Sequence, residues 1–450
     1  MPSLSALMPN LNLNISLGRG GGTVVGLDVQ PGYVAAVQAH VNGGIVVERA
    51  AGAALAPDIM REGEVLDERE LGAALRELFE DGRLGKRVRV GLANQRTVLR
   101  TLELPPVTDR KELDAAVRFQ AEDQVPMPLA SAVLDYHSLG VFDTPNGPRQ
   151  RVIVVAAQRE MVEKMLRAVS YAGLRAEGVD LSAFALIRSL YHPGAAHAAA
   201  QSEGGEGGDT ERVLYLNVGG LTNMAIAEGT LCRFTRVVGG GLEAMASEIA
   251  ERRGIPLVDA RAQLAEFELP RPGAAPSPAL PGRTTASAPH APAATPVLPD
   301  PEAVETWALA QDPSAEPQAT PAAAPENGPT IHLDLPDLPP EPEPEPAAPA
   351  LDPEVRMVLE NGIREIVGEV RNSLEFHRSQ EGGGEVKSVV LSGPALEMRG
   401  FSEALEADLG LEVRRESVHF ADNADQSAAH PISPHRLAIA TGLATEEAPR

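Results

Sequence analysis

The feature that most constrains the fold of this chain is a short pattern that occurs twice. Residues 24–37 read V-V-G-L-D-V-Q-P-G-Y-V-A-A-V, and residues 213–227 read V-L-Y-L-N-V-G-G-L-T-N-M-A-I-A. Each segment has an apolar run, an acidic or amide residue, a glycine-bearing turn and a second apolar run, which is typical of two antiparallel strands joined tightly. Backbone N–H groups in a glycine-rich turn can converge on an anion. Two such hairpins predict a duplicated, two-lobed architecture with a phosphate-sized ligand between the lobes.

A proline-rich stretch interrupts the second half of the chain. Residues 270–353 contain 23 of the 39 prolines, together with 12 acidic and two basic residues, so they contribute −10 to the total charge of −24. Proline removes backbone donors, and the apolar side chains here show no period, so we expect residues 269–353 to be a disordered acidic linker. The rest of the chain is only moderately acidic. This charge argues against nucleic acid as a partner, because phosphate binding requires a basic surface.

Cysteine content and hydropathy bear on the cellular compartment. The single cysteine, Cys232, cannot form an internal disulfide. No apolar run approaches the roughly 18 residues of a membrane span, so we expect no direct membrane insertion. Residues 1–22 lack the basic start and continuous apolar core of a signal peptide, and we expect them to be a flexible leader. These features predict a cytoplasmic protein.

Hydrophobic periodicity predicts strands that alternate with helices along most of the chain. Expected helices cover residues 67–80, 109–124, 159–172, 180–190, 242–253, 259–267, 354–379, 400–408 and 435–443. Besides the two hairpins, expected strands cover residues 87–94, 133–139, 150–157, 231–238 and 386–391. Such alternation is typical of an α/β protein. The histidines are scattered without metal-ligand spacing, so no zinc site is expected.

Four segments of the second half resemble the nucleotide motifs of actin-like ATPases; they are residues 215–220, 237–250, 389–405 and 437–444. By themselves these motifs leave open division proteins of the FtsA type, sugar kinases and heat-shock chaperones. A more selective segment, A-V-R-F-Q-A-E-D-Q-V-P-M-P-L-A-S-A-V-L-D-Y at residues 116–136, resembles the helix, double-proline and strand signature of the PilM family of type IV pilus assembly. Residues 152–186 and 372–380 fit the same family.

The resemblance implies an α/β, two-lobed actin-like (ribonuclease H-like) fold with an inserted small α/β subdomain and a long disordered proline-rich insertion. The first lobe would comprise residues 23–100 and a hinge helix at 177–193, with the inserted subdomain at 101–176 between them. A flexible connector would cover residues 194–210. The second lobe would comprise residues 211–268 and, after the linker, residues 354–445 with a return helix.

The resemblance also implies a site for ATP and Mg²⁺ between the lobes. The implied cofactor contacts are Asp28, Gln30, Gly32, Asn217, Gly219, Gly220, Gly239, Gly240 and Gly393. Asp28 would hold Mg²⁺ through water, since hard cations prefer oxygen ligands. Asp180 would position water, so Asp28 and Asp180 are the expected catalytic residues.

The sequence departs from the family pattern at several of these positions. Pro31 has no N–H to donate, and Ala35 stands where the family has a lysine. Neutral Asn217 stands in place of an aspartate, and Gly393 is followed by Pro394 instead of a second glycine. These departures leave ATP binding open and predict that it is weak and that hydrolysis is weak or absent, so we expect a scaffold in place of an enzyme.

The implied partner is the short cytoplasmic N-terminal tail of a PilN-like inner-membrane protein, received in a groove between the inserted subdomain and the first lobe. The expected contact residues are Gln120, Glu122, Pro126 and Pro128. Pilus motor ATPases are further candidate partners, and an oligomer is left open. The protein would lie in the cytoplasm, peripheral to the inner membrane through its partners. The alternatives are an FtsA-like cell-division filament protein, although residues 443–450 lack the apolar face of a membrane helix, and an actin-fold sugar kinase, although no sugar-pocket motif is found.

Overall fold

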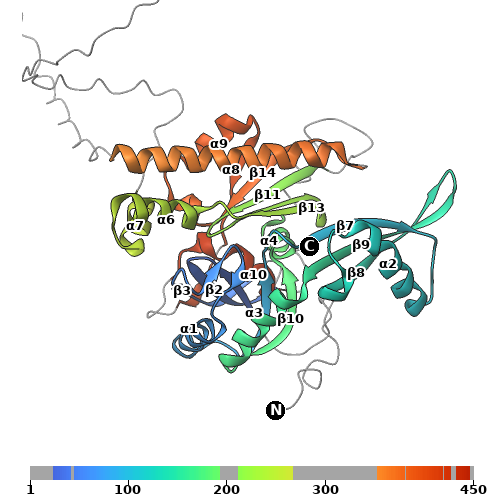
Figure 1. Cartoon of the computed structure of the whole chain (residues 1–450), viewed down its shortest axis with the longest axis horizontal. Coiled ribbons are helices and arrows are strands. Elements are labelled where there is room, and N and C mark those ends of the chain that lie inside the picture. The colour runs from blue at the N-terminus through green and yellow to red at the C-terminus, as the bar shows by residue number, and fades with distance from the viewer. Residues whose placement is uncertain are drawn as a thin grey trace, which may run out of the picture. The chain divides into compact units, whose positions relative to one another are not determined.

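The computed structural model describes residues 24–41, 45–192, 211–266, 352–380, 382–418, 420–426 and 432–445. The predicted leader and the connector at 194–210 lie outside these residues, as does the predicted linker apart from Asp352 and Pro353. The described residues form two lobes and a small subdomain within one unit (Figure 1).

The first lobe is built on a mixed six-stranded sheet with the strand order β10-β6-β1-β2-β3-β16. Its strands are β1 (Val25–Gln30), β2 (Tyr33–Val41), β3 (Ile45–Ala54), β6 (Arg87–Leu92), β10 (Arg175–Leu181) and β16 (Phe420–Gln426). Strands β1, β2 and β3 pair antiparallel, which confirms the first predicted hairpin. Alternate residues of β1 enter an apolar core that the helices α1 (Glu68–Asp81) and α3 (Arg159–Tyr171) complete. A short hairpin, β4 (Met60–Arg61) and β5 (Glu64–Val65), precedes α1.

The second lobe is built on a five-stranded sheet with the order β13-β12-β11-β14-β15. Its strands are β11 (Arg212–Val218), β12 (Thr222–Glu228), β13 (Leu231–Val238), β14 (Val386–Ser392) and β15 (Glu412–Arg415), and its helices are α6 (Leu242–Arg253), α7 (Leu257–Ala265), α8 (Pro353–Ser379) and α9 (Phe401–Leu409). Asp352 caps α8 by accepting a hydrogen bond from the Glu354 N–H. The apolar stripe of α8 packs into the core of this lobe, and Figure 1 shows the helix running along the sheet.

Two helices lie between the sheets of the two lobes, α4 (Ser182–Leu190) and α10 (Ala438–Ala444). A single hydrophobic cluster joins them to β2 of the first lobe and to β11 and β12 of the second. The packing is close: a Cβ at Gly26 of β1 would lie 1.8 Å from the Ala440 carbonyl oxygen, and one at Gly442 would lie 1.8 Å from the Ala185 carbonyl oxygen. Only glycine permits these approaches, so helix α10 is fixed against both β1 and α4.

The inserted subdomain has a three-stranded antiparallel sheet of its own, with the order β7-β9-β8. It consists of β7 (Val98–Leu104), α2 (Arg110–Gln124), a short 3-10 helix, η2 (Leu129–Ser131), β8 (Ala132–Thr144) and β9 (Gly147–Gln158). Asp109 caps α2 by accepting from two backbone N–H groups. Buried Val117 joins the core formed by α2 and the sheet.

The predicted elements match the structure more closely than the predicted subdomain boundary does. The helices expected at 109–124 and 354–379 are confirmed as α2 and α8. The predicted subdomain boundary lies at residue 176; the sheet of the subdomain ends at Gln158, and α3 packs both against α1 in the core of the first lobe and against β9. The helix expected at 180–190 begins at Ser182, because Asp180 and Leu181 still pair with β6 as the end of β10.

Candidate functional site

The first hairpin carries a buried carboxyl group. Asp28 of β1 is 1% exposed, and its Oδ2 accepts a hydrogen bond of 2.8 Å from Gln30 Nε2. Burial raises the pKa of Asp28 to about 7, although the hydrogen bond from Gln30 opposes the rise. Asp28 Oδ1 and Gln30 Oε1 have no hydrogen-bond partner among the described residues. Both side chains are therefore buried with acceptor capacity that the chain itself leaves unused.

The second hairpin carries buried amides at the equivalent place. Asn217 of β11 lies opposite Asn223 of β12, and its Nδ2 donates to Ser392 Oγ at 3.0 Å. Asn217 Oδ1 and both polar atoms of the Asn223 side chain lack partners among the described residues. The two hairpins thus both bring unpaired polar groups to the buried ends of their strands.

The turns of the two hairpins touch each other. A Cβ at Gly220 would lie 2.0 Å from the Pro31 carbonyl oxygen, and one at Gly219 would lie 2.8 Å from Gln30 Oε1 and 3.0 Å from the Tyr33 hydroxyl. Any other residue at Gly220 would push the turns apart, because it would meet the Pro31 backbone, whereas one at Gly219 would displace the ends of the Gln30 and Tyr33 side chains. Gly32 completes the first turn with φ of +86°, a value that favours glycine.

An interlobe cavity of about 80 Å³ lies beside this contact. Residues 31–33 and 219–220 of the two turns line it. Charged side chains complete the lining: Glu243 of α6, Arg261 of α7, and Glu397 and Arg436 of two short 3-10 helices. Arg436 Nη2 lies 3.1 Å from Glu397 Oε2, and its guanidinium lies 5.1 Å from the centre of the Tyr33 ring. Burial raises the pKa of Tyr33 well above its ordinary value. Glu397 belongs to the short 3-10 helix η3 (Pro394–Glu397), and Arg436 to η4 (Pro434–Arg436).

The predicted catalytic residue Asp180 does not line the interlobe cavity. It forms an ion pair with Arg188 of α4, and it accepts a hydrogen bond of 2.8 Å from the Leu181 N–H. Arg188 also donates to the Gly442 carbonyl oxygen of α10 at 3.1 Å. These contacts give Asp180 a place in the packing of the central helices.

The predicted glycines lie in several places around the turns. Gly32, Gly219 and Gly220 line the interlobe cavity, and Gly220 and Gly239 line a second cavity of about 520 Å³, which Pro31 also borders. The Gly240 carbonyl oxygen accepts from Thr222 Oγ1 at 2.6 Å, which ties the start of α6 to the second hairpin. Gly393 has φ of +96°, and a Cβ there would lie 2.6 Å from the Val218 carbonyl oxygen.

Sequence reasoning missed the charged residues of the interlobe cavity: Glu243, Arg261, Glu397 and Arg436. Glu243 and Glu397 lie inside the actin-like motifs at 237–250 and 389–405, so their neighbourhood was already marked in the sequence. No local pattern distinguishes Arg261 or Arg436 from other surface arginines.

The site fits Mg²⁺ and phosphate only in part. The unpaired oxygens Asp28 Oδ1 and Asn217 Oδ1 suit a ligand that brings a cation, and glycines at 219 and 220 permit close approach. However, the turns are in contact, and the cavity of about 80 Å³ is far below the roughly 300 Å³ or more of small-molecule sites. A nucleotide therefore fits the cavity of about 80 Å³ only after the two turns separate, whereas the cavity of about 520 Å³ that Gly220 and Gly239 line is large enough without that movement.

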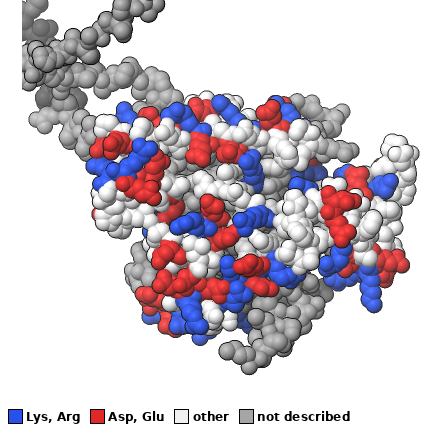
Figure 2. All heavy atoms as spheres, viewed as in Figure 1, with Lys and Arg blue, Asp and Glu red and all other residues white. Residues whose placement is uncertain are grey.

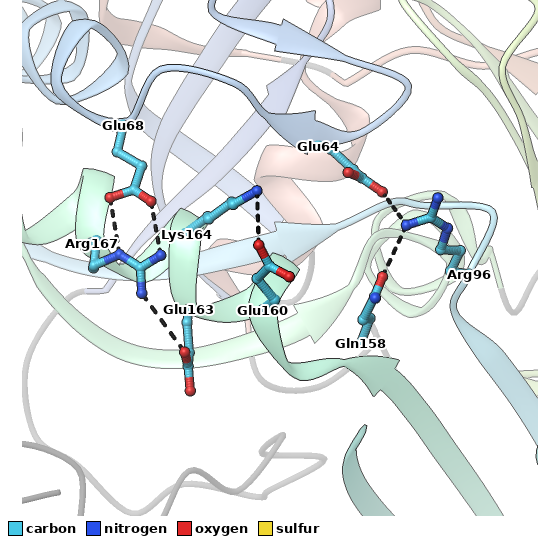
Figure 3. Close-up of polar contacts among 8 residues, drawn as sticks. All are labelled: Glu64, Glu68, Arg96, Gln158, Glu160, Glu163, Lys164 and Arg167. Carbon is cyan, nitrogen blue, oxygen red and sulfur yellow. Dashed lines mark hydrogen bonds and ion pairs between the residues drawn. The ribbon is translucent and has the colours of Figure 1, made fainter. Parts of the chain in front are cut away.

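A second polar site lies at the neck of the inserted subdomain, which we define as Glu64, Arg96 and Gln158 (Figure 3). Arg96 Nη1 donates to Glu64 Oε1 of β5 at 2.8 Å and to Gln158 Oε1 at the end of β9 at 3.0 Å. Asn94 supports it, because its Oδ1 accepts from the Arg96 N–H while its Nδ2 donates to the Glu62 carbonyl oxygen. One arginine therefore joins the first lobe to both chain connections of the subdomain.

Figure 3 also shows the ion pairs that hold α3 on the first lobe. Arg167 donates to both carboxylate oxygens of Glu68, at 2.9 Å and 2.8 Å, and hydrogen bonding to Arg167 lowers the pKa of Glu68. Glu163 and Lys164 extend this set along α3, with Lys164 paired to Glu160 at 3.2 Å. Helix α3 is thus anchored by a bidentate ion pair at the point where the chain leaves the subdomain.

The predicted partner-binding residues lie together at the end of α2. Glu122, Pro126 and Pro128 are exposed, and Gln120 is half-buried. Val125 lies between them and is buried in a small core with Ala121 and Ala156, so the double-proline turn is anchored while its prolines face solvent. Sequence reasoning did not single out Phe119, whose side chain is 74% exposed on the same helix.

Two further observations concern the described part of the chain. None of its helices is long and apolar enough to cross a membrane, and none of its His, Cys, Asp and Glu side chains gather in threes as a metal site would require. On the face shown in Figure 2, basic and acidic side chains are interspersed, and no continuous basic surface is seen there.

Comparison with known proteins identifies the fold and the family. A solved structure of a PilM-PilN type IV pilus biogenesis complex matches 94% of this chain and 98% of its own chain, with a TM-score of 0.62 at 19% identity. Weaker matches are the ethanolamine utilization protein EutJ from Carboxydothermus hydrogenoformans, with a TM-score of 0.43 at 13% identity over 96% and 92% of the two chains, and MreB5 of Spiroplasma citri bound to ADP, with a TM-score of 0.41 at 11% identity over 94% and 95%.

The predicted α/β, two-lobed actin-like fold with an inserted subdomain is confirmed. The disorder predicted for the proline-rich insertion falls outside the described residues, apart from its last two. The actin-like motifs alone left several families open, whereas the more selective segment at residues 116–136 resembled the PilM family, and this resemblance is confirmed. A family model described as Type IV pilus assembly protein PilM covers residues 26–272, which is more than half of the 450 residues, so this chain belongs to the PilM family.

Proposed function

We propose that this chain is an actin-like scaffold of type IV pilus assembly that binds the short cytoplasmic N-terminal tail of a PilN-like inner-membrane protein. The observation that carries the proposal is the family match over residues 26–272, which includes the whole inserted subdomain. The solved PilM-PilN complex, which shares the fold over 94% of the chain, supports the choice of partner. The protein would act in the cytoplasm and reach the inner membrane through this partner.

The end of α2 and the neck form the surface that we assign to the tail. Pro126 and Pro128 fix the backbone after α2, so their exposed face is rigid before a peptide arrives. Glu122 offers a carboxylate beside them, and half-buried Gln120 offers an amide that can bond to a peptide backbone. The neck arginine, Arg96, would set the angle of this surface relative to the first lobe.

We also propose that the interlobe site binds ATP and Mg²⁺ weakly and turns ATP over slowly. Asp28 would hold Mg²⁺, and the backbone N–H groups of Gly219 and Gly220 would contact phosphate once the turns separate. A bound nucleotide supplies negative charge that both lobes can contact, which would shift the population of lobe angles. The absent lysine at Ala35 and the absent N–H at Pro31 remove two phosphate contacts, so the residues favour a regulatory ligand over rapid catalysis.

The test of the tail-binding proposal is a titration of the full-length protein with a fluorescent peptide that has the N-terminal cytoplasmic sequence of a PilN-like protein. Saturable binding is expected. The double substitution Pro126→Ala and Pro128→Ala should weaken binding by about tenfold, because each proline that rigidifies a compatible backbone contributes roughly 0.4–1 kcal/mol.

Pro145 provides a matched control, since it is an exposed proline in the β8–β9 turn of the same subdomain, away from α2. Pro145→Ala should leave the affinity unchanged, and a scrambled peptide should not bind. If the folded protein binds no such tail, or if the Pro145 variant weakens binding as much as the α2 variant, the assigned surface is wrong.

A further inference from the structure

One guanidinium group joins the two lobes across the interlobe cavity. Arg261 of α7 donates from Nε to Glu243 Oε2 at 3.0 Å and from Nη2 to Glu243 Oε1 at 2.5 Å. The same Nη2 donates to the Leu55 carbonyl oxygen at 3.0 Å. Arg261 and Glu243 belong to the second lobe, whereas Leu55 follows β3 in the first. The Arg261 side chain therefore holds a carboxylate of its own lobe and a backbone carbonyl of the other at once.

The turn of the first hairpin lies directly against this ion pair. A Cβ at Gly32 would lie 2.3 Å from Glu243 Oε2 and 3.3 Å from Arg261 Nη2. The side chains of Arg261 and Glu243 are only 25% and 15% exposed. This bidentate ion pair fixes the Arg261 guanidinium within the second lobe, so that it is already oriented to donate to the Leu55 carbonyl of the first.

A second ion pair of the same kind lines the cavity. Arg436 contacts both oxygens of Glu397, at 3.3 Å and 3.1 Å, and its guanidinium lies over the ring of Tyr33 in the first hairpin. The charges of these two arginines and two glutamates sum to zero, so the four side chains present no net positive charge to a triphosphate. The guanidinium groups are committed to internal partners in this closed arrangement.

We propose that Arg261, held in place by Glu243, tethers the second lobe to the Leu55 carbonyl of the first in the absence of nucleotide; the inference rests on the proposed nucleotide site, since a nucleotide that enters between the turns must break the contact with Leu55. The lobes are then held closed by contacts within the chain, without any bound ligand. A ligand that binds between the turns must favour the open arrangement by more than the tether favours the closed one.

The experiment measures amide hydrogen exchange in the full-length, nucleotide-free protein. The reporters are peptides that cover residues 28–35, 52–58 and 217–224, which contain both turns and the Leu55 contact. Arg261→Ala should speed exchange in these peptides by about tenfold, the size expected when hydrogen bonds to a charged group are lost. Arg261→Lys keeps the charge but loses the planar fork, so its effect should be intermediate.

Arg252→Ala is the matched control. Arg252 pairs with Glu248 at 2.7 Å along α6, in the same lobe, but this pair is exposed and does not cross the cleft. Its removal should leave the exchange of all three peptides unchanged. Should Arg261→Ala fail to fold, Glu243→Gln removes the carboxylate that positions Arg261 with little change of shape, and it should accelerate exchange in the same peptides by a smaller factor.

A nucleotide titration completes the test. Because the tether opposes entry, Arg261→Ala should bind ATP with Mg²⁺ more tightly than the unchanged protein, by up to about tenfold. Weaker binding by this variant would show that Arg261 is a phosphate ligand and would overturn the tether. Unchanged exchange in both the Arg261→Ala and Glu243→Gln proteins would overturn it independently.

Discussion

The interlobe cleft and the neck of the inserted subdomain are both held by arginine side chains, but their surroundings differ. Arg261 is 25% exposed and its partner Glu243 is 15% exposed, whereas the Arg96 side chain at the neck is 62% exposed. In the cleft, glycine turns also touch without spare room. A buried bidentate pair is costly to break, and an exposed pair contributes little. In the cleft, the buried pair fixes Arg261 against the Leu55 carbonyl and the turns touch, so the lobes are coupled firmly. The subdomain is held by an exposed arginine, loosely enough to adjust to a partner.

The largest expected effect concerns Asp28, which the cleft buries. Because the pKa of Asp28 is about 7 in the folded protein against an ordinary 3.8, the folded state keeps a proton that the unfolded state loses. The contribution of Asp28 to the free energy of unfolding therefore falls as pH rises from about 4 to about 7, by about 4 kcal/mol in total. Asp28→Asn stays neutral and should be spared this loss.

Thermal unfolding of both proteins at acidic and mildly alkaline pH, with a chelator present, checks this expectation. The Asn variant should gain stability relative to the unchanged protein as pH rises. Parallel pH profiles of the two proteins would mean that water reaches Asp28 in spite of the packing. The cleft would then be solvated like the neck, and the difference between the two regions would be lost.

The next effect tests the contact between the turns. Gly220→Ala places a methyl group 2.0 Å from the Pro31 carbonyl oxygen, so the turns must separate, at a cost of about 1–3 kcal/mol. Gly368 of α8 is the matched control, since a Cβ there meets nothing within 4 Å. Gly368→Ala should stabilise the protein by about 0.5–1 kcal/mol, because alanine favours the helix. Chemical denaturation should show a lower free energy of unfolding for Gly220→Ala and a higher one for Gly368→Ala. A change of the same sign in both variants would contradict a tight contact between the turns.

A third prediction concerns the weakness of the nucleotide site. Asn217→Asp restores a carboxylate at the second hairpin, so ATP binding should tighten by about tenfold with Mg²⁺ and not without it. Calorimetric titration with and without the metal separates the two cases. Turnover by the unchanged protein should stay far below about one per second. Faster turnover that Asp28→Ala abolishes would show a working ATPase.

The smallest effect is expected at the neck. Arg96→Ala removes the link between Glu64 and Gln158, and exposed pairs of this kind contribute roughly 0.2–1 kcal/mol. Tail-peptide affinity should fall by about threefold, and the difference should shrink at high salt. Arg118→Ala, which removes an exposed pair within α2, is the control and should leave affinity unchanged. A hundredfold loss of tail-peptide affinity in Arg96→Ala would show that the neck is as rigid as the cleft.

The hairpins and the long helices could be predicted because local pattern determines them. The strand containing Asp28 alternates apolar and polar residues, and the stripe of α8 repeats at helical spacing. The strand β3 escaped prediction because its second half, R-A-A-G-A-A, lacks the β-branched and aromatic residues typical of strands.

The contacts of the candidate site could not be predicted in the same way. Arg261 meets Glu243 because α7 packs on α6, and it meets Leu55 because the two lobes close on each other; nothing in the sequence around α7 encodes either contact. Asp180 precedes an apolar helix, so its position in the sequence resembles that of a helix cap. In the structure it pairs with β6 as part of the end of β10, and it forms an ion pair with Arg188. An acidic residue at such a position therefore indicates a turn or the end of a helix or strand, but it does not reveal which groups its carboxylate contacts.

The chain leaves the core of the second lobe after α7 and returns to it with α8 at a neighbouring point. Helix α7 contributes Leu264 and helix α8 contributes Val355 to one cluster, and Arg253 of α6 lies 3.2 Å from Asp352 at the start of α8. The two described ends of the lobe, at residues 266 and 352, therefore lie near each other. For any flexible connection, doubling its length costs only about 0.6 kcal/mol more. A reporter or a grafted binding module inserted between these two ends should consequently leave the lobe intact.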